Sequence, residues 1–292
     1  MPQNSVCAVI VTFHPRAEDF GNLAKVRPQV EDLVVVDNGS SEESLYLLRA
    51  ASHDLNFVLI ENSENLGIGA ALNIGVKWAE SNGSKWVTLF DQDSTVTENF
   101  ISQMIVDFEN AATRGNLGLL VPRYRDPKSG IERVFVLAKD SGPFVTITSG
   151  SFFSVEIFHK CGYFQEELFI YTVDDEYSLR LRSNGYTIGQ SRDAVLLHAS
   201  GHPTQYYLFG IMLFSPSNHS AGARYYLNRN RVWMMRTYGL KYPRWAYEVM
   251  SGAAKEVLKI ALAEKNSWLK LSMMLLGIRD GLLMRMGKTV EI

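Results

Sequence analysis

The sequence has few cysteines, no excess of positive charge and no long uncharged apolar run. Its 292 residues include two cysteines, Cys7 and Cys161, which lie far apart. This spacing excludes a disulfide framework or a cysteine metal site and is typical of a reducing compartment. The net charge of −2 argues against a nucleic-acid-binding protein, which would carry a basic excess. No window of about 18 residues is both free of charge and apolar throughout, so we expect no transmembrane helix.

Two phosphate-binding fingerprints and a targeting segment are also missing. No Gly-x-Gly-x-x-Gly follows the first expected strand and no Gly-x-x-x-x-Gly-Lys-Ser/Thr occurs, so neither a Rossmann fingerprint nor a Walker loop is predicted. The N-terminus shows no basic segment followed by an apolar signal region, and we therefore expect a cytoplasmic protein. With 46% hydrophobic and 21% charged residues, the composition is that of an ordinary globular protein.

Apolar runs and helical patterns alternate over the first ninety residues or so. The expected strands are Val6–Phe13, Leu33–Val36, Phe57–Ile60 and Trp86–Phe90, and the expected helices are Ala17–Val26, Glu42–Ala51 and Ile68–Ser81. This alternation predicts an α/β domain with a mostly parallel, Rossmann-like central sheet. The fold class we expect is therefore α/β, with helices covering the sheet.

The regular alternation ends after the fourth expected strand. The next expected elements are a helix at Asn99–Thr113, a strand at Leu117–Val121, antiparallel strands at Ile131–Leu137 and Phe144–Ile147, a helix from Asp174, and short strands at Tyr186–Gly189 and Ala194–His198. Three long helical patterns follow at Arg224–Tyr238, Tyr242–Leu262 and Trp268–Met286. We expect a catalytic domain over residues 1–220 and a C-terminal helical region over residues 221–292.

The C-terminal helices combine aromatic residues and methionine with Lys and Arg. They could cover the α/β core, pair with a second copy of the chain in a homo-oligomer, or lie on a membrane, and the sequence leaves all three open. Amphipathic helices of this composition suit the surface of a membrane. A peripheral location at the inner face of the cell membrane is thus an alternative to a purely cytoplasmic one.

Polar residues stand where each of the first four strands ends. Thr12 and Asp37 end the first two strands, Asn65 follows the third, and Asp91 and Asp93 end the fourth. The carboxyl ends of parallel strands share one edge, where α/β folds bind ligands. Two closely spaced carboxylates suit Mg²⁺ or Mn²⁺ with a phosphate-bearing ligand. The alternative is that Asp93 only caps the next helix.

Seven motifs stand in order between residues 6 and 232. They are Val9–Phe13, Val36–Ser40, Asn65-Leu66-Gly67 with Gly69, Ala70 and Asn73, Asp91-Gln92-Asp93, Asp174–Arg180, His198 with Gly201, and Arg224–Tyr226 with Arg229-Asn230. Together they resemble the inverting GT-A glycosyltransferases of family 2, and the Asp-Gln-Asp form resembles the bacterial rhamnosyltransferases among them. The resemblance implies a metal-dependent transfer of L-rhamnose from dTDP-rhamnose to a bacterial cell-surface polysaccharide or a lipid-linked oligosaccharide.

The resemblance also implies roles for residues of the donor site. Thr12 and Asp37 would bind the nucleotide base, and an Asp carboxylate can accept the imide N–H of a pyrimidine. Asn65 and Gly67 would lie near the nucleotide and the diphosphate, with Gly allowing close backbone approach. Asp91 would hydrogen-bond the ribose or the sugar. Arg224 and Arg229 would approach the diphosphate, although a solvated basic helix face is an alternative for both.

Catalysis and metal binding are assigned by the same resemblance. Asp93 would bind Mg²⁺ or Mn²⁺, and His198 is the candidate second ligand, unless it is a core histidine. Asp174 would be the general base, with Asp175 as the alternative, and clustered acids raise one another's pKa. These acids could also only favour a helix N-terminus. Related rhamnosyltransferases often carry Asp and Trp where Tyr171 and Tyr177 stand here, so acceptor binding is less well defined.

Two other functions fit the same sequence. One is transfer from a different donor, such as UDP-galactofuranose or a UDP-hexose. The other is a catalytically silent scaffold subunit of a polysaccharide assembly complex. The presence of Asp91, Asp93 and Asp174 argues against the silent alternative.

Overall fold

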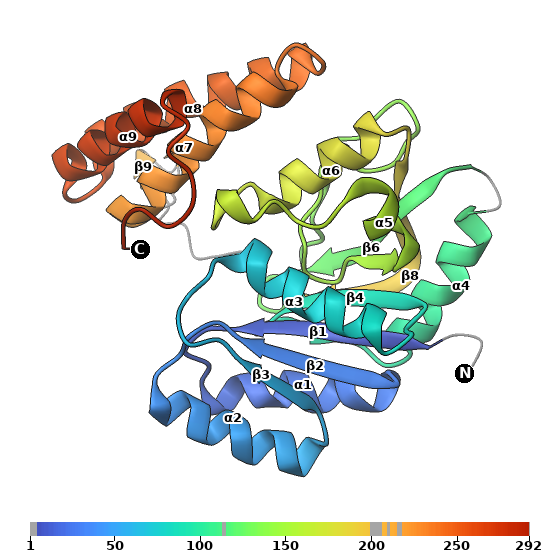
Figure 1. The fold of residues 1–292 in the computed structure, drawn as a ribbon. Helices are drawn as coiled ribbons and strands as arrows, with labels where there is room; N and C mark the ends of the chain where they lie inside the picture. The colour runs from blue at the N-terminus through green and yellow to red at the C-terminus, as the bar shows by residue number, and fades with distance from the viewer. Residues whose placement is uncertain (1–4, 113–114, 199–205, 209–210, 215–217, 292) are drawn as a thin grey trace. The chain divides into compact units, whose positions relative to one another are not determined.

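The structure is a computed structural model that describes all residues except 1–4, 113–114, 199–205, 209–210, 215–217 and 292 (Figure 1). The chain divides into two compact units. The first comprises the chain up to Glu166 together with Val173–Ala199, and the second comprises Glu167–Thr172 and Ser200–Ile292. The boundary expected at residue 220 stays a prediction. Gly201 lies outside the described residues.

An eight-stranded mixed sheet forms the centre of the first unit, in the order β3-β2-β1-β4-β7-β6-β8-β5. Its strands are β1 (Val6–Thr12), β2 (Asp32–Asp37), β3 (Val58–Glu61), β4 (Trp86–Asp91), β5 (Thr95–Val96), β6 (Leu117–Arg125), β7 (Phe152–Ser154) and β8 (Thr187–Leu197). The first four strands are parallel, as predicted. All seven residues of β1 are buried, which explains its unbroken apolar run.

Helices cover both faces of the parallel strands. They are α1 (Phe20–Val26), α2 (Glu42–Leu55), α3 (Ile68–Ser81), α4 (Phe100–Ala112), α5 (Glu156–Cys161) and α6 (Val173–Ser183), with short 3₁₀ turns at Ala17–Asp19, Arg27–Gln29 and Glu166–Leu168. α1 and α2 lie on one face and α3 on the other (Figure 1). The chain thus changes faces between β3 and β4, and it leaves a topological switch point between β1 and β4.

The middle of the chain differs from the sequence prediction. The prediction of antiparallel strands at Ile131–Leu137 and Phe144–Ile147 is wrong, because the chain between β6 and β7 forms only isolated bridges. Val134 is 91% exposed, so its side chain has no second layer to pack against. The two short strands expected after Tyr186 form one continuous strand, β8, while β5 and β7 were not predicted.

The second unit contains α7 (Ala221–Tyr238), α8 (Pro243–Ala263), α9 (Ser267–Leu282) and a hairpin of β9 (Tyr206–Leu208) and β10 (Ile211–Phe214). The three helices confirm the sequence prediction. Phe169, Tyr225 and Tyr226 form a buried cluster against which Met273 and Leu276 of α9 pack. Among the described residues, no helix has the length and apolar character needed to cross a membrane.

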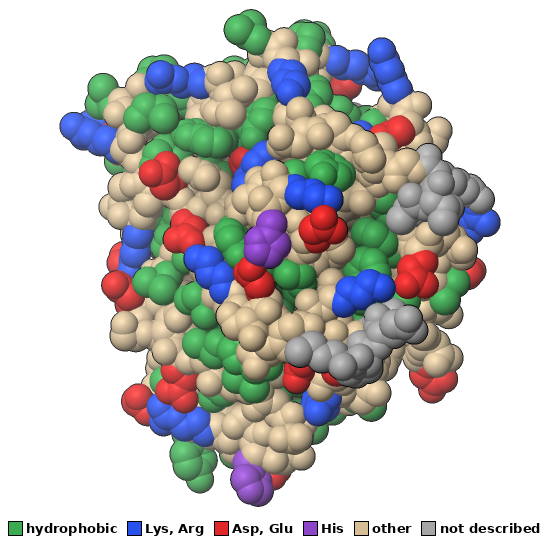
Figure 2. All heavy atoms as spheres, turned by 45° about the vertical axis from the view of Figure 1, so that its right-hand side comes forward, with side chains coloured by type: hydrophobic (Ala, Val, Ile, Leu, Met, Phe, Trp, Pro, Cys, Tyr) green, Lys and Arg blue, Asp and Glu red, His purple; other side chains and the backbone are tan. Residues whose placement is uncertain are grey.

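Charges of both signs are mixed on the face of the molecule drawn in Figure 2. Lys and Arg side chains alternate there with Asp and Glu, and hydrophobic side chains show between them. This mixing on one face is in keeping with the small net charge of the chain.

Candidate active site

The ends of β1 and β2 meet at Thr12 and Asp37, which are paired in register. The Thr12 hydroxyl donates to Asp37 Oδ2 over 3.0 Å, and the Ser40 backbone N–H donates to Oδ1 over 2.9 Å. Asp37 is fully buried. The Ser40 hydroxyl also donates to Oδ2, so the carboxylate is fixed in place by three donors. These bonds bring the two predicted base-binding residues together.

The loop after β3 is joined to the turn after β2 by asparagine side chains. Asn38 Nδ2 donates to Asn65 Oδ1 over 3.0 Å, and the Gly67 N–H donates to the same oxygen over 2.9 Å. Gly39 has φ of 85° and lies so close to Glu64 that a Cβ would fall 2.4 Å from its backbone. Only glycine fits such a turn. The packing explains the Asp-Asn-Gly-Ser motif and places Asn65 and Gly67 beside Asp37.

Asp91 is the last residue of β4 and lies opposite Val11 of β1, and Gln92 and Asp93 follow it. Gln92 connects this loop to the end of β1, because its Oε1 accepts the Phe13 N–H over 2.8 Å. Its backbone carbonyl accepts Asn22 Nδ2 over 3.0 Å. The Gln92 side chain therefore holds the Asp-x-Asp loop against the loop that follows β1.

Asp91, Asp93 and His198 could hold a metal ion. Each offers one ligand atom, and these atoms lie within 4.8 Å of one another. The His198 Nδ1 lies 3.0 Å from the Ser94 hydroxyl, which leaves Nε2 as the nitrogen free for a cation. Two carboxylates and one imidazole form a donor set that fits Mg²⁺ or Mn²⁺. The site thus contains the two predicted metal ligands and adds Asp91.

A second layer of hydroxyl groups supports these ligands. Ser149 is fully buried, and its hydroxyl lies 2.7 Å from the Ser94 hydroxyl. The same Ser149 hydroxyl accepts the Asp91 N–H over 3.1 Å. One serine on the segment before β7 therefore connects the end of β4 with the partner of His198. This connection fixes the spacing of the acidic loop and the histidine.

The electrostatics of the site favour a bound cation. Burial, followed by the negative charges of Asp93 and Asp174, raises the pKa of Asp91 to about 7. Burial lowers the pKa of His198, which keeps the imidazole neutral and able to bind a metal. A divalent cation would offset the repulsion between the carboxylates.

Asp174 and Asp175 stand in the first turn of α6, where acids interact favourably with the helix dipole. The Asp174 Oδ1 accepts the Asp175 N–H over 3.0 Å. Burial raises the pKa of Asp174, and burial together with the charge of Asp174 raises the pKa of Asp175 to about 7. The positive charge of Arg133 opposes both shifts in pKa. Arg133, in the irregular stretch before β7, thus faces the acidic cluster formed by Asp91, Asp93, Asp174 and Asp175.

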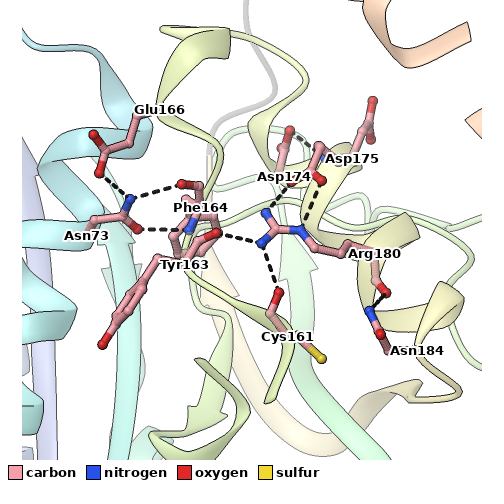
Figure 3. A network of polar contacts seen from close by, with 10 residues as sticks. Asn73, Cys161, Tyr163, Phe164, Glu166, Asp174, Asp175, Arg180 and Asn184 are labelled. Atoms are coloured by element: carbon pink, nitrogen blue, oxygen red, sulfur yellow. Dashed lines mark hydrogen bonds and ion pairs between the residues drawn. The ribbon is translucent and has the colours of Figure 1, made fainter. Parts of the chain in front are cut away.

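A network of hydrogen bonds holds α6 within the first unit (Figure 3). Arg180 pairs with Glu176 and donates to the backbone carbonyls of Cys161, over 3.0 Å, and Tyr163. Asn73 of α3 donates to the Phe164 carbonyl and accepts its N–H, both over 2.9 Å. The network explains two motif residues, Asn73 and Arg180, as supports of the helix that carries Asp174.

Arg224 and Arg229 lie in the second unit, and both side chains are buried there. Arg224 pairs with Glu264 at 2.7 Å and also with Glu256. Arg229 donates to the carbonyls of Leu168, over 2.9 Å, and Gly287. Their predicted contact with a diphosphate stays a prediction, and within the second unit their guanidinium groups bind carboxylates and backbone oxygens.

Sequence comparison agrees with this geometry. The family described as Glycosyl transferase family 2 matches residues 9–158, which include the ends of β1 to β4. The dTDP-rhamnosyl transferase RfbF of Shigella flexneri is 31% identical over 246 residues, covering 80% of this chain and 80% of that protein. The chain belongs to glycosyl transferase family 2. It is a glycosyltransferase, and the family predicted from its motifs is confirmed.

Solved structures confirm the GT-A fold of the enzyme. The mannosyltransferase PcManGT from Pyrobaculum calidifontis, in complex with GDP-Man and Mn²⁺, has a TM-score of 0.61 at 16% identity and matches 96% of this chain and 88% of its own. GalNAc-T7 with UDP, GalNAc and Mn²⁺ also has a TM-score of 0.61, at 14% identity, over 84% of this chain. This chain spans 50% of the length of that GalNAc-T7 chain.

Four residues of the site were missed or left unexplained by sequence reasoning. Gln92, Ser94, Ser149 and Arg133 support or face the acidic cluster. Ser149 carries no motif signal, because a serine before a strand is common in loops. Only the position of Gln92 between two candidate ligands could have drawn attention to its side chain.

Proposed function

We propose that the enzyme transfers L-rhamnose from dTDP-rhamnose, with inversion, to a saccharide acceptor of a bacterial cell-surface polysaccharide or its lipid-linked precursor. The observation that carries the donor assignment is the 31% identity to a dTDP-rhamnosyl transferase over 80% of both chains. The Asp-Gln-Asp loop of the candidate site, which resembles the rhamnosyltransferase form, supports the same donor.

The donor would bind along the carboxyl ends of β1, β2 and β4. Thr12 and Asp37 would contact the base, and Asn65 and Gly67 would lie beside the nucleotide. Asp93 and His198 would hold Mg²⁺ or Mn²⁺. Asp91 would either bind the same cation or lie beside it, and it would also contact the sugar or the ribose. The bound cation would neutralise the charge of the departing diphosphate. PcManGT and GalNAc-T7, whose structures include Mn²⁺, support a divalent cation here.

Asp174 would act as the general base. In a direct displacement, a carboxylate on the face opposite the diphosphate takes the proton of the acceptor hydroxyl as that oxygen bonds to the anomeric carbon and the bond to the diphosphate breaks. The charge of Asp174 raises the pKa of Asp91, so these two carboxylates lie near each other. This proximity supports Asp174 as the base, with Asp175 as the alternative.

A panel of nucleotide sugars tests the donor assignment. The enzyme is incubated with Mn²⁺ or Mg²⁺ and dTDP-rhamnose, UDP-galactofuranose, UDP-glucose or UDP-GlcNAc, and release of the nucleoside diphosphate is measured. We expect metal-dependent release from dTDP-rhamnose above that from any UDP-sugar. Faster release from a UDP-sugar would replace the donor, and no release from any sugar nucleotide would favour the scaffold function.

We also propose that α8 and α9 hold the enzyme peripherally at a membrane with anionic lipids. Tyr247, Met250, Val257, Leu258 and Leu262 are exposed on α8 at helical spacing, and Tyr247 and Leu262 are 74% and 77% exposed. On α9, Trp268, Leu275 and Leu282 follow one another at seven-residue intervals and are also exposed. Apolar stripes of this kind suit the interface of a bilayer.

The charges on these helices point to an anionic surface. Between residues 243 and 288 the chain carries twice as many Lys and Arg as Asp and Glu. Glu256, Glu264 and Asp280 are turned inward and ion-paired. The cations Lys255 and Lys265 are exposed, so the outer surface is more basic than the composition alone suggests.

Vesicle sedimentation distinguishes the membrane from a second copy of the chain. We expect binding to vesicles of phosphatidylcholine with phosphatidylglycerol, weaker binding to phosphatidylcholine alone, and loss of binding in Trp268→Glu with Leu275→Glu. Tyr46→Glu on α2, where Tyr46 is 73% exposed, is the matched control and should bind normally. A dimer in light scattering that the double variant dissociates, without vesicle binding by the wild type, would assign these helices to self-association.

A further inference from the structure

The loop at Glu167–Thr172 has an unusual backbone and leads directly into the helix that carries Asp174. Phe169, Tyr171 and Thr172 have φ values of 64°, 62° and 58°, in the left-handed region that residues with side chains rarely adopt. Thr172 immediately precedes α6, and Asp174 is the second residue of that helix. Three such residues within four positions persist only where the surroundings fix the backbone.

Asn230 of α7 forms hydrogen bonds that hold the backbone of this loop. Its Nδ2 lies 2.9 Å from the Leu168 carbonyl, 2.7 Å from the Ile170 carbonyl and 3.1 Å from the Tyr171 carbonyl. A primary amide has two N–H groups, so the three carbonyls share two donors. The side chain is completely buried, and water cannot replace these bonds.

Arg229 orients the amide and adds a second set of bonds. Its Nε donates to Asn230 Oδ1 over 3.0 Å, which sets the amide with its nitrogen toward the loop. Its Nη2 donates to the Leu168 carbonyl over 2.9 Å and to the Glu167 carbonyl over 3.3 Å. The Gly287 N–H also donates to the Glu167 carbonyl over 2.8 Å. Four carbonyls of the loop, those of Glu167, Leu168, Ile170 and Tyr171, therefore accept hydrogen bonds from Arg229, Asn230 or Gly287.

We infer that Asn230, oriented by Arg229, is a positioning residue for Asp174: it holds the left-handed loop whose last residue, Thr172, immediately precedes α6. The inference deepens the proposed function, since it rests on Asp174 as the general base. Asn230 does not contact the reacting groups; it acts through the backbone of residues 168–172. A small error in the position of a catalytic carboxylate can cost about 100-fold in rate.

The experiment compares Asn230→Ala with Asn228→Ala. Asn228 lies on the same helix, is also buried, and bonds to Arg224 and Arg231 and not to the loop. We expect Asn230→Ala to lower kcat for rhamnosyl transfer by about 10–100-fold, to leave the KM for dTDP-rhamnose within about 3-fold, and to shift the acid limb of the pH–rate profile. We expect Asn228→Ala to keep kcat within about 3-fold of the wild type at a comparable loss of thermal stability.

A second variant keeps the inference testable if Asn230→Ala folds poorly. Thr172→Gly removes the steric cost of a positive φ at the end of the loop. Combined with Asn230→Ala, it should restore part of the lost kcat, because the left-handed backbone then needs less support. Equal kcat values for Asn230→Ala and Asn228→Ala, or no gain from Thr172→Gly in a folded double variant, would overturn the inference.

Asp174→Asn, measured in parallel, separates the inference from the proposed function. If Asp174→Asn transfers rhamnose at the normal rate, the base assignment has failed. If Asp174→Asn is inactive while Asn230→Ala matches its control, only the positioning role has failed.

Discussion

The Ser94 hydroxyl lies 3.0 Å from Nδ1 of His198 and 2.7 Å from the hydroxyl of Ser149. The pair fixes the ring of His198 so that Nε2 is the nitrogen available to a cation. Groups that form a hydrogen bond with the other ring nitrogen of a metal-binding histidine affect both the orientation of the ring and the affinity for the metal.

Ser94→Ala should therefore weaken metal binding without removing a ligand. We expect the Mn²⁺ concentration for half-maximal activity to rise by about 10-fold, with a smaller change at saturating Mn²⁺. The measurement is nucleoside diphosphate release over a Mn²⁺ titration. Ser102→Ala on the exposed side of α4 is the control. An unchanged titration curve in Ser94→Ala would show that the Ser94 hydroxyl does not contribute to metal binding.

Asp93→Ala should have a larger effect, because it deletes a proposed ligand. Turnover with dTDP-rhamnose should fall by about 100-fold or more, and added Mn²⁺ should not restore it. Calorimetric titration with Mn²⁺ in the presence of dTDP should show the loss of binding. If the variant keeps both metal binding and turnover, Asp93 is not a ligand and the cation lies elsewhere.

Gln92→Ala tests the connection between the Asp-x-Asp loop and the end of β1. The Gln92 Oε1 accepts the Phe13 N–H over 2.8 Å, and losing one such bond costs about 1 kcal/mol. We expect the KM for the donor to rise by about 5-fold, with kcat changed less, because the loop is ordered for binding and not for proton transfer. Steady-state kinetics measure both constants. A fall in kcat with an unchanged KM would contradict this role.

The raised pKa of Asp175 predicts a pH-dependent stability. Burial and Asp174 raise it to about 7, above the value of about 3.9 for an unfolded chain. The folded protein thus binds this proton more tightly, and the stability gained from it is lost as the pH rises from about 4 through 7.

Asp175→Asn should therefore be more stable than the wild type at pH 8, by about 1 kcal/mol after allowing for partial exposure, and nearly equal to it at pH 5. Urea unfolding at the two pH values measures the difference. Asp54→Asn on the exposed side of α2 controls for the loss of one charge. A variant that is less stable than the wild type at pH 8 would show that the carboxylate is stabilised by partners in its ionised form.

The sequence predicted the parts of the fold that depend on buried apolar runs. Strands β1, β2 and β4 end where Thr12, Asp37 and Asp91 interrupt those runs, so the edge of the sheet and its polar residues could be located. The resemblance to the family then added Asp174 and His198 to the same site. In the structure the charge of Asp174 acts on Asp91, and a ligand atom of His198 lies within 4.8 Å of those of Asp91 and Asp93.

Other parts depended on long-range contacts that the sequence does not display. Residues Ile131–Leu137 are rich in β-branched and aromatic side chains, as strands are, yet no neighbouring layer covers Val134. Ser149 is 58 residues from Asp91 in the chain, and only the folded sheet brings their hydrogen bond about. Asn230 likewise contacts a loop about sixty residues earlier. Such tertiary contacts override local propensity.

Calorimetric binding of nucleotide sugars tests the assignment of dTDP-rhamnose as the donor. Wild-type enzyme with Mn²⁺ is titrated with dTDP-rhamnose, and then with UDP-glucose and UDP-galactofuranose under the same conditions. We expect dTDP-rhamnose to bind at least about 10-fold more tightly than either UDP-sugar, a difference of about 1.4 kcal/mol in binding free energy. We also expect the removal of Mn²⁺ to weaken the binding of dTDP-rhamnose. Tighter binding of a UDP-sugar, or binding of dTDP-rhamnose that does not depend on the metal, would contradict these expectations.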